Sequence, residues 1–440
     1  MSNDREISLG VPGVRRRSRL AVAVLAVLAL LGAACSDDDG ATTTDGDSAS
    51  TDGGGAGEEV LGEPAPASGE PVKVGFIHDG KSPVRDATVD RQVAEATSEY
   101  LNDYRSGLAG RPIELVECEA LAEPSRAVDC ANQMVQEEVA AVVIGAFSNL
   151  EAIFDPIHAA GIPMMVWAGV GQTVLADPDS TFVLTNSFFG LADLPISVAK
   201  DAGVDKVNVV VIDLPITTSF YKAAGKAYFG AEDIDMNLIT IPPGTADMTP
   251  QMQAIAGDDA LVHVIGNDAF CIAAFNGLKA TGFDGPVSTV SQCMTDATRE
   301  QTDPEVLDGM VQQAAAPLGE DDDPDIQLFN AVLDKYAPED TDRTSAFGVG
   351  MFTTLTALVD ATEGLSGEVT AATVLAAIKA MPEKDLPAGG GVKFQCNGKA
   401  LAPLPLPAVC GSGGLRATLD AEGVPASYDL VTKVPDAAAG

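Results

Sequence analysis

Short apolar segments rich in β-branched residues alternate with longer segments of helical periodicity from residue 72 onward, and this alternation restricts the fold more than any other feature. The short segments are apolar at consecutive positions, which is typical of strands buried on both faces. The longer segments carry apolar residues three and four positions apart, which indicates crossover helices. The expected strands are 72–77, 113–117, 140–144, 164–167, 207–212, 238–241, 261–265 and 287–290, and the expected helices include 89–104, 125–137, 149–160 and 270–281.

This order predicts an α/β protein with two doubly wound parallel-sheet lobes joined by a hinge. There are too many strands for one domain, and residues 177–190 are where we expect the chain to leave the first lobe. Residues 326–381 have helical patterns and little strand, so we expect them to return to the first lobe. The expected division is lobe 1 at 71–189, lobe 2 at 190–318, returning helices at 319–385, and a C-terminal segment on lobe 2 at 386–436.

The first 34 residues have the pattern of an export signal. Arginines precede an uninterrupted run of small and apolar residues from 20 to 34, which is shorter than the roughly 20 residues of a membrane span. Small residues then precede Cys35, as at a bacterial lipoprotein cleavage site. We therefore expect an extracytoplasmic protein anchored to the bacterial cell membrane by lipidated Cys35. An ordinary secretory signal is the alternative, and Arg16-Arg17 also fits a twin-arginine signal.

Residues 35–70 have the composition of a flexible acidic tether. They are rich in Ser, Thr, Asp and Gly and contain no Lys or Arg, so they cannot bury a core. A flexible chain of this length would hold the folded part about 30–35 Å from the lipid.

The charge balance excludes one class of partner. The chain has 64 Asp and Glu residues against 26 Lys and Arg, a formal net charge of -38 at pH 7. A chain this acidic does not bind nucleic acid through a broad basic surface, and anionic membrane surfaces repel it. The lipid is therefore the only membrane contact that we expect.

Six cysteines follow Cys35, an even number that suggests disulfides in an exported chain. Their spacing leaves every pairing possible, and we favour the sequential one. A metal site is the alternative, but no Cys-x-x-Cys occurs and the histidines, His78, His158 and His263, are scattered, so no metal is expected. The favoured pairs are Cys118 with Cys130, Cys271 with Cys293, and Cys396 with Cys410.

Several short motifs follow one another along the chain: KVGFI at 73–77, YLN at 100–102, GRPIEL at 110–115, PSRA at 124–127, VVIG at 142–145, GIP at 161–163, AF at 274–275, LDG at 307–309 and AFGV at 346–349. In their order and spacing, over about residues 71–435, they resemble type 1 periplasmic binding proteins of the leucine/isoleucine/valine-binding kind. The resemblance implies a receptor whose two lobes close on a small ligand and deliver it to an ABC permease.

The loops that follow the first-lobe strands are the first candidates for ligand contact. The resemblance implies that Ser148 and nearby main-chain amides receive a ligand carboxylate, which the positive end of a helix also favours. Ser148 and Glu151 have capping-box spacing, so Ser148 is equally expected as an N-cap. Trp167, Ala168 and Val170 lie where relatives place main-chain groups and often a threonine. This chain has no threonine there, and Trp167 would either stack on the ligand or belong to the core.

His78 and Asp79 end the first strand and would point toward the same loops, or cap the following turn. In the second lobe, Asn267 and Asp268 follow a strand in the region where relatives present a polar or acidic group to a ligand amine. Asp268 is therefore the expected counter-ion, with a helix N-cap as its alternative role.

Thr218 and Phe220 complete the candidate ligand contacts. They lie in residues 213–220, which replace a tyrosine-glycine segment common in relatives.

The expected function is that of a monomeric receptor, without cofactor, for a branched-chain or other amino acid, or an amide. One alternative is a sensor on the same fold for an amide, urea-like or aromatic compound. The other is an exported serine hydrolase using Ser219 and Lys222, but the Lys-Thr-Gly and Ser-Asp-Asn triplets of such enzymes are absent from the sequence. We expect no enzyme.

Overall fold

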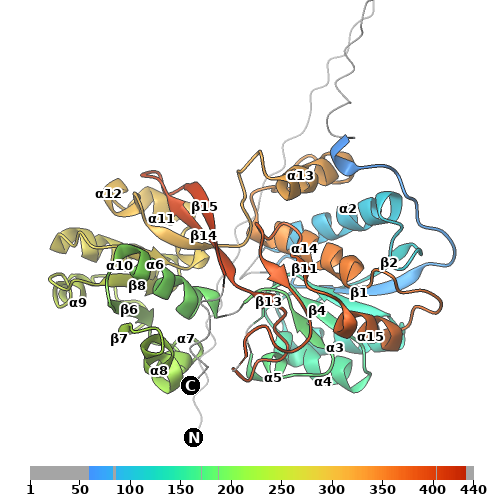
Figure 1. Cartoon of the computed structure of the whole chain (residues 1–440), viewed down its shortest axis with the longest axis horizontal. Helices are drawn as coiled ribbons and strands as arrows, with labels where there is room; N and C mark the ends of the chain where they lie inside the picture. Colours follow the sequence, from blue (N-terminus) through green and yellow to red (C-terminus); the bar gives the residue numbers. More distant parts are fainter. Residues whose placement is uncertain (1–58, 83–85, 170, 187, 403, 433–440) are drawn as a thin grey trace, which may run out of the picture. The chain divides into compact units, whose positions relative to one another are not determined.

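The first of two large sheets contains five parallel strands in the order β2-β1-β3-β4-β5 (Figure 1). The computed structural model describes residues 59–82, 86–169, 171–186, 188–402 and 404–432. The strands are β1 (Val72–His78), β2 (Ile113–Glu119), β3 (Ala141–Ile144), β4 (Met164–Val166) and β5 (Thr181–Val183). The helices that connect them are α2 (Thr88–Tyr104), α3 (Pro124–Gln136), α4 (Leu150–Ala159) and α5 (Gln172–Leu175). The doubly wound parallel sheet expected for the first lobe is confirmed.

The second sheet contains seven strands in the order β15-β14-β10-β9-β8-β6-β7. Its parallel part is β6 (Lys206–Ile212), β7 (Asp235–Ile241), β8 (Leu261–Ile265), β9 (Val287–Thr289) and β10 (Val311–Ala314). An antiparallel hairpin, β14 (Gly414–Leu419) and β15 (Pro425–Val431), extends the edge at β10. The parallel sheet expected for the second lobe is thus confirmed, and the hairpin adds two antiparallel strands that were not among the expected ones.

Most helices of the second lobe are short. Before β7 they are η1 (Phe189–Asp193), α6 (Leu194–Ala202), α7 (Pro215–Phe220), η2 (Tyr221–Gly225) and α8 (Lys226–Gly230). After β7 they are α9 (Thr249–Gln253), α10 (Asp268–Thr281), η3 (Ser291–Cys293), α11 (Asp296–Gln301) and α12 (Pro304–Leu307).

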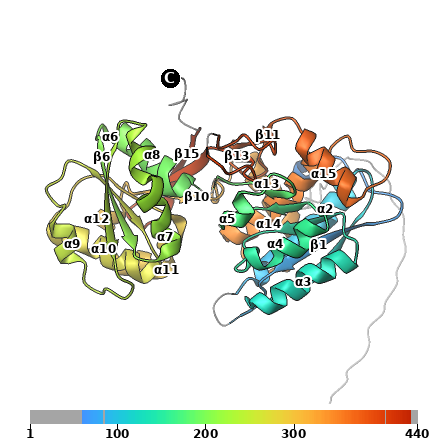
Figure 2. The ribbon, with the colours of Figure 1, turned by 90° about the horizontal axis from the view of Figure 1, so that it is seen from below.

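Three later helices return to the first sheet: α13 (Pro324–Tyr336), α14 (Ala346–Ala361) and α15 (Ala371–Ala380). Figures 1 and 2 show α2, α13 and α14 on one face of this sheet and α3 and α4 on the other. Val74 and Phe76 of β1 share a core with α2, α13 and α14. Ile77 points to the other face of the sheet and is buried in the core with α3 and α4. Because α14 is apolar on nearly all sides, it is buried almost along its whole length.

The C-terminal segment does not lie wholly on the second lobe, as residues 386–436 were expected to do. Leu386, Phe394 and Cys396 are buried in the same core as Phe76 of β1. The main chain also joins β5, because the Cys410 amide donates to the carbonyl of Val183 at 2.8 Å. A small antiparallel sheet, β11 (Lys384–Asp385), β12 (Lys393–Phe394) and β13 (Gly411–Ser412), completes this part. The segment therefore reaches the second sheet only at β14.

The end of the expected tether is folded against the first lobe. Leu61 is 4% exposed and packs into the core beside α2. The amides of Ala65 and Ala67 donate to the carbonyls of Asp103 and Asn102 at 3.0 and 2.7 Å. A buried leucine and main-chain pairing therefore order residues 59–70 despite their polar composition. The expected export signal, Cys35 and the rest of the tether lie outside the described residues.

The three disulfides are the sequential pairs favoured from the sequence. Cys118–Cys130 ties β2 to α3, and Cys271–Cys293 ties α10 to η3. Cys396–Cys410 closes the loop between β12 and β13. Within the described part of the chain, every helix is too short or too polar to span a membrane.

His263 is a buried titratable group in the centre of the second sheet. Its Nε2 lies 2.9 Å from the carbonyl oxygen of Gly190, which can only accept, so Nε2 carries the proton. Its Nδ1 then accepts from the Ser288 hydroxyl at 2.8 Å. Burial, partly opposed by these two hydrogen bonds, lowers the pKa of His263 to about 4.

We predict that His263 makes the fold less stable as pH falls from about 6.5 to about 4. In this window the unfolded chain takes up a proton on His263 that the folded chain does not, and the full effect is about 3 kcal/mol. The His263→Gln variant should lose this contribution, so its free energy of unfolding, measured by urea titration at several pH values, should fall less steeply below pH 6.5. Equal slopes in the two proteins would contradict the prediction.

Candidate functional site

The loops after β1 and β3 meet because the two strands are parallel neighbours, with Phe76 paired to Val143. Asp79 follows β1 and is fully buried. Its Oδ2 accepts hydrogen bonds from the Ser148 amide at 3.0 Å and from the Ser148 hydroxyl at 2.7 Å. Two residues that are 69 positions apart thus form one polar unit at the carboxyl edge of the first sheet.

Ser148 is not the N-cap of the following helix. The cap position is Asn149, and α4 begins at Leu150. The Glu151 carboxylate accepts from the Thr173 amide at 3.1 Å, in the first turn of α5. The capping box expected from Ser148 and Glu151 is therefore wrong, because the Ser148 side chain bonds to Asp79 and the Glu151 side chain to the Thr173 amide. Ligand contact by Ser148 stays a prediction.

His78 points away from Asp79, as successive residues of a strand do. Its ring stacks on Phe76 with centroids 4.6 Å apart, and its Nε2 lies 2.9 Å from the Glu117 carboxylate on β2. Only 3% of His78 is exposed. It therefore lies in the helix layer beside α2 and is not brought together with the loops after β3 and β4.

Trp167 lies directly after β4 and packs on α14. A Cβ on Gly350 would lie 2.4 Å from the indole ring, so only a glycine fits there. The Trp167 carbonyl accepts from the amide and the hydroxyl of Thr185 at 3.0 and 2.9 Å, which fixes the loop. Trp167 is 9% exposed, so most of its surface belongs to the core. Ala168 beside it is half-buried, and Val170 lies outside the described residues.

Phe347 is an aromatic neighbour that the sequence analysis did not select as a site residue. It lies at the start of α14, is 41% exposed, and meets Trp167 edge to face with ring centroids 6.5 Å apart. The AFGV motif at 346–349 was the available signal, but only the structure shows that Phe347 meets Trp167.

In the second lobe, Asn267 caps α10 by accepting from the Phe270 amide at 3.0 Å. Asp268 is half-buried in the first turn, and its carboxylate accepts from the Ala269 amide at 2.7 Å. The alternative of an Asp268 N-cap is therefore wrong, because Asn267 holds that position. Both residues line a cavity of about 510 Å³ that also reaches Ile212 at the carboxyl end of β6.

Thr218 and Phe220 lie on α7. The Thr218 side chain is buried and donates to the Leu214 carbonyl at 3.1 Å, within its own helix. Phe220 is half-buried and packs edge to face against Phe188 and Tyr228, with ring centroids 4.9 and 5.8 Å apart. The structure thus turns Thr218 toward the main chain and places Phe220 in an aromatic cluster.

The residues of the alternative hydrolase are both on the surface of this region. Ser219 is exposed, and the Lys222 ammonium lies 3.3 Å from the Asp213 carboxylate.

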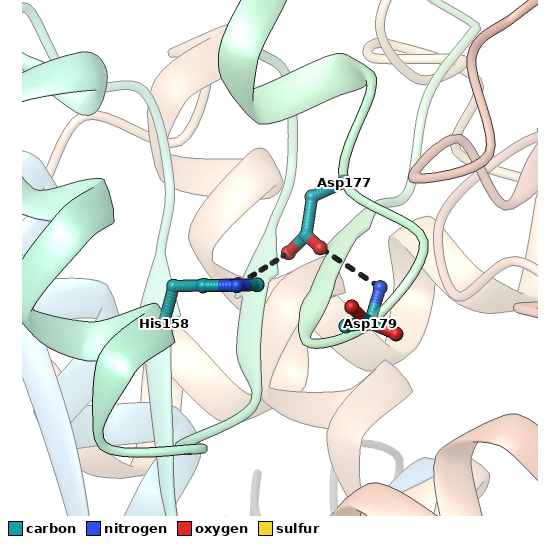
Figure 3. A group of neighbouring side chains, drawn as sticks. All are labelled: His158, Asp177 and Asp179. Carbon is teal, nitrogen blue, oxygen red and sulfur yellow. Dashed lines mark hydrogen bonds and ion pairs between the residues drawn. The ribbon is translucent and has the colours of Figure 1, made fainter.

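His158, Asp177 and Asp179 form a further polar group in the first lobe (Figure 3). The His158 Nδ1 lies 3.4 Å from the Asp177 carboxylate and 3.1 Å from the Ser180 hydroxyl. Burial raises the pKa of Asp177, but hydrogen bonds from the Asp179 amide, the Thr181 side chain and the Ser180 amide outweigh it, so this pKa lies below its usual value. These bonds close the turn before β5 and tie it to the end of α4.

Comparison with known proteins gives a family. Residues 71–409 match the family model described as periplasmic binding protein. No curated protein matches the chain.

Three similar solved structures share its fold. The branched-chain amino acid transporter substrate-binding protein LivJ from Streptococcus pneumoniae, in complex with isoleucine, is 16% identical, with a TM-score of 0.61 over 82% of this chain and 100% of that one. A putative branched-chain amino acid ABC transporter from Silicibacter pomeroyi is 17% identical, with a TM-score of 0.66 over 83% and 97%. The leucine-binding protein LivK from Thermotoga maritima is 16% identical, with a TM-score of 0.58 over 82% and 98%.

We predict that Gly350→Ala displaces Trp167. The added Cβ overlaps the indole ring, so the variant should lose about 1–3 kcal/mol of unfolding free energy. Because Trp167 is the single tryptophan of the chain, its emission maximum should shift to longer wavelength. The control is Gly230→Ala at the end of α8, where a Cβ would meet no atom within 4 Å. Unchanged emission and stability in Gly350→Ala would show that the indole does not rest on this glycine.

Proposed function

Since this chain belongs to the periplasmic binding protein family, we propose that its ligand is an amino acid or a closely related compound, which it delivers to an ABC permease. The protein is an extracytoplasmic solute-binding receptor and not an enzyme. Ligand contacts on both lobes would bias a hinge equilibrium toward a closed form.

One observation carries the proposed binding site: polar and aromatic side chains gather on loops at the carboxyl ends of parallel strands. In open parallel sheets this edge is where ligands bind. Ser148 and Trp167 follow β3 and β4 on the first sheet, and Asn267 and Asp268 follow β8 on the second. Phe347 adds exposed apolar surface beside Trp167. Such a mixture suits a small molecule with an apolar part and a few polar groups.

The choice of an amino acid is supported by the solved structures of the same fold. LivJ contains isoleucine and LivK is a leucine-binding protein, although both are only distantly similar in sequence. The exposed ring of Phe347 is compatible with an apolar side chain of this kind.

We also propose that residues 1–34 direct export and that lipidated Cys35 anchors a monomeric receptor. Residues 59–70 pack along the first lobe and would therefore add nothing to the reach of the tether. Lobe 1 at 71–189 and lobe 2 at 190–318 would then be the two halves that close on the ligand.

We predict that an amino acid raises the unfolding midpoint of the purified exported protein and changes the Trp167 emission. A ligand at 100 times its dissociation constant stabilises the folded state by about 2.7 kcal/mol. Amino acids, amides, aromatic acids and sugars should be compared by thermal unfolding. Phe347→Ala should weaken binding, whereas Val128→Ala, which removes an exposed apolar side chain on α3, should not. If no amino acid shifts the midpoint and a compound of another class does, the proposed ligand class is wrong.

We predict that Cys35→Ser releases the protein from the membrane. Without the thiol there is no attachment point for the lipid, so the variant should move from the membrane fraction to the soluble fraction. Cell fractionation followed by mass measurement of the wild-type N-terminus tests this directly. A wild-type protein that is already soluble and unmodified would point instead to an ordinary secretory signal.

A further inference from the structure

We propose that the first lobe binds a zinc ion between the end of α4 and the turn before β5. His158, Asp177 and Asp179 each offer one ligand atom, and water completes the coordination. This site goes beyond the proposed receptor function and does not depend on it, because its ligand is a transition-metal cation and not a transported solute.

The spacing between His158 and Asp177 carries this inference. The His158 Nδ1 lies 3.4 Å from the Asp177 Oδ2, and Figure 3 shows the ring and the carboxylate facing each other. An ordinary N–H···O hydrogen bond is shorter, at about 2.7–3.2 Å. Two atoms that each lie about 2.0–2.1 Å from a zinc ion with tetrahedral geometry are about 3.4 Å apart. The pair is therefore spaced as two ligands of one zinc ion.

Asp177 is fixed in the orientation that a ligand needs. Its side chain is 1% exposed, and its Oδ1 accepts from the Asp179 amide at 2.8 Å. Its Oδ2 accepts from the Ser180 amide at 3.2 Å. Hydrogen bonds of this kind orient a carboxylate that binds a metal ion.

The Ser180 hydroxyl lies where it would give way to the metal ion. It is 3.2 Å from the Asp177 Oδ2 and 3.1 Å from the His158 Nδ1, and its one proton can be donated to only one of them at a time. When this hydroxyl turns away, it leaves a lone pair on the carboxylate oxygen and one on the imidazole nitrogen. The loss is a single hydrogen bond between uncharged or singly charged groups, which is small beside two metal–ligand bonds.

The His158 imidazole selects the class of metal. Its ring stacks on Phe154 with centroids 4.9 Å apart, which fixes the ring plane, and its side chain is 38% exposed, so an ion can enter from solvent. Imidazole nitrogen suits zinc and its transition-metal neighbours, whereas magnesium and calcium prefer oxygen ligands.

Asp179 is the mobile third ligand. Its side chain is 69% exposed, and a carboxylate oxygen lies within 4.8 Å of the other two ligand atoms. The Lys379 ammonium on α15 is 3.8 Å from the Asp179 Oδ1, an exposed pairing that holds the side chain only weakly. The Asp179 carboxylate can therefore turn toward an ion that His158 and Asp177 already hold.

The zinc site lies away from the proposed ligand site. Helix α4 starts after β3 at the carboxyl edge of the first sheet, so its last turn lies at the amino edge, where β5 begins. A zinc ion would thus tie α4 to β5 and stabilise the first lobe without entering the loops after β1, β3 and β4. Scattered histidines predict no metal from the sequence, but in the fold two carboxylates of one turn take the place of further histidines.

Zinc titration of the untagged wild-type protein, freed of metal by a chelator and without any solute, tests the inference. The chain has three histidines, and His78 and His263 are buried. The NMR signals of the imidazoles should show one ring that shifts and saturates at one equivalent of zinc, and this signal should be absent from His158→Gln. Zinc should also raise the unfolding midpoint of the wild type and not of His158→Gln. Three unshifted imidazoles, or an equal rise in both proteins, overturns the inference.

Two further variants test the individual ligands. Asp179→Asn should weaken zinc binding at least about tenfold, whereas Asp205→Asn, which removes an exposed carboxylate of the second lobe, should not change it. Ser180→Ala should bind zinc at least as tightly as the wild type, because it removes the hydroxyl that competes for both ligand atoms. Wild-type affinity in Asp179→Asn, or weaker binding in Ser180→Ala, contradicts the assigned coordination.

Competition separates a zinc site from general attraction of cations to an acidic protein. Magnesium and calcium at the concentration of zinc should leave the shifted imidazole signal unchanged. If either ion displaces zinc, the assignment to zinc is wrong. Since no solute is present, a negative zinc result leaves the proposed receptor function intact, and a failure of that function leaves the zinc result intact.

Discussion

The need to cover both faces of a parallel sheet determines the course of this chain. The first sheet buries one face under α3 and α4, but α2 alone cannot cover the other. The chain therefore completes most of the second sheet and then returns with α13 and α14, whose side chains share a core with β1 and β3. Since α14 begins at the carboxyl edge of the sheet, the same return places Phe347 and Gly350 against Trp167. Helix α14 therefore both covers the core and completes the candidate site.

The buried strands were predictable because their sequence signal is local. Consecutive apolar residues identify β1, β3, β6 and β8 without reference to any partner. Among the strands that were missed, β5 has only three residues, and β14 and β15 are half-exposed antiparallel strands at an edge, so all three lack this signal. The folded end of the tether was missed for a related reason, since its order depends on one buried leucine and on main-chain hydrogen bonds.

The candidate site was less predictable than the fold. The sequence located Ser148, Trp167, Asn267 and Asp268 beyond the carboxyl ends of their strands, because the residues that follow a strand lie at that end. Their contact with a ligand stays a prediction. It could not show that Ser148 donates hydrogen bonds to Asp79, because a hydrogen bond between residues so distant in the chain produces no periodic sequence pattern. Nor could it show that Gly350 provides the surface for Trp167. Local sequence patterns thus predict where the candidate site lies. Which polar and apolar groups it presents depends on contacts between residues far apart in the chain.

The sequential disulfides bear on how an exported chain acquires its fold. The paired cysteines are separated by 12, 22 and 14 residues, and no pair encloses a cysteine of another. In chain order, each cysteine pair is therefore complete before the first cysteine of the next pair. Oxidation in the order of the chain gives the native set, and no bond then has to be broken and exchanged. None of these bonds joins the two large sheets, so oxidation adds no covalent link between them.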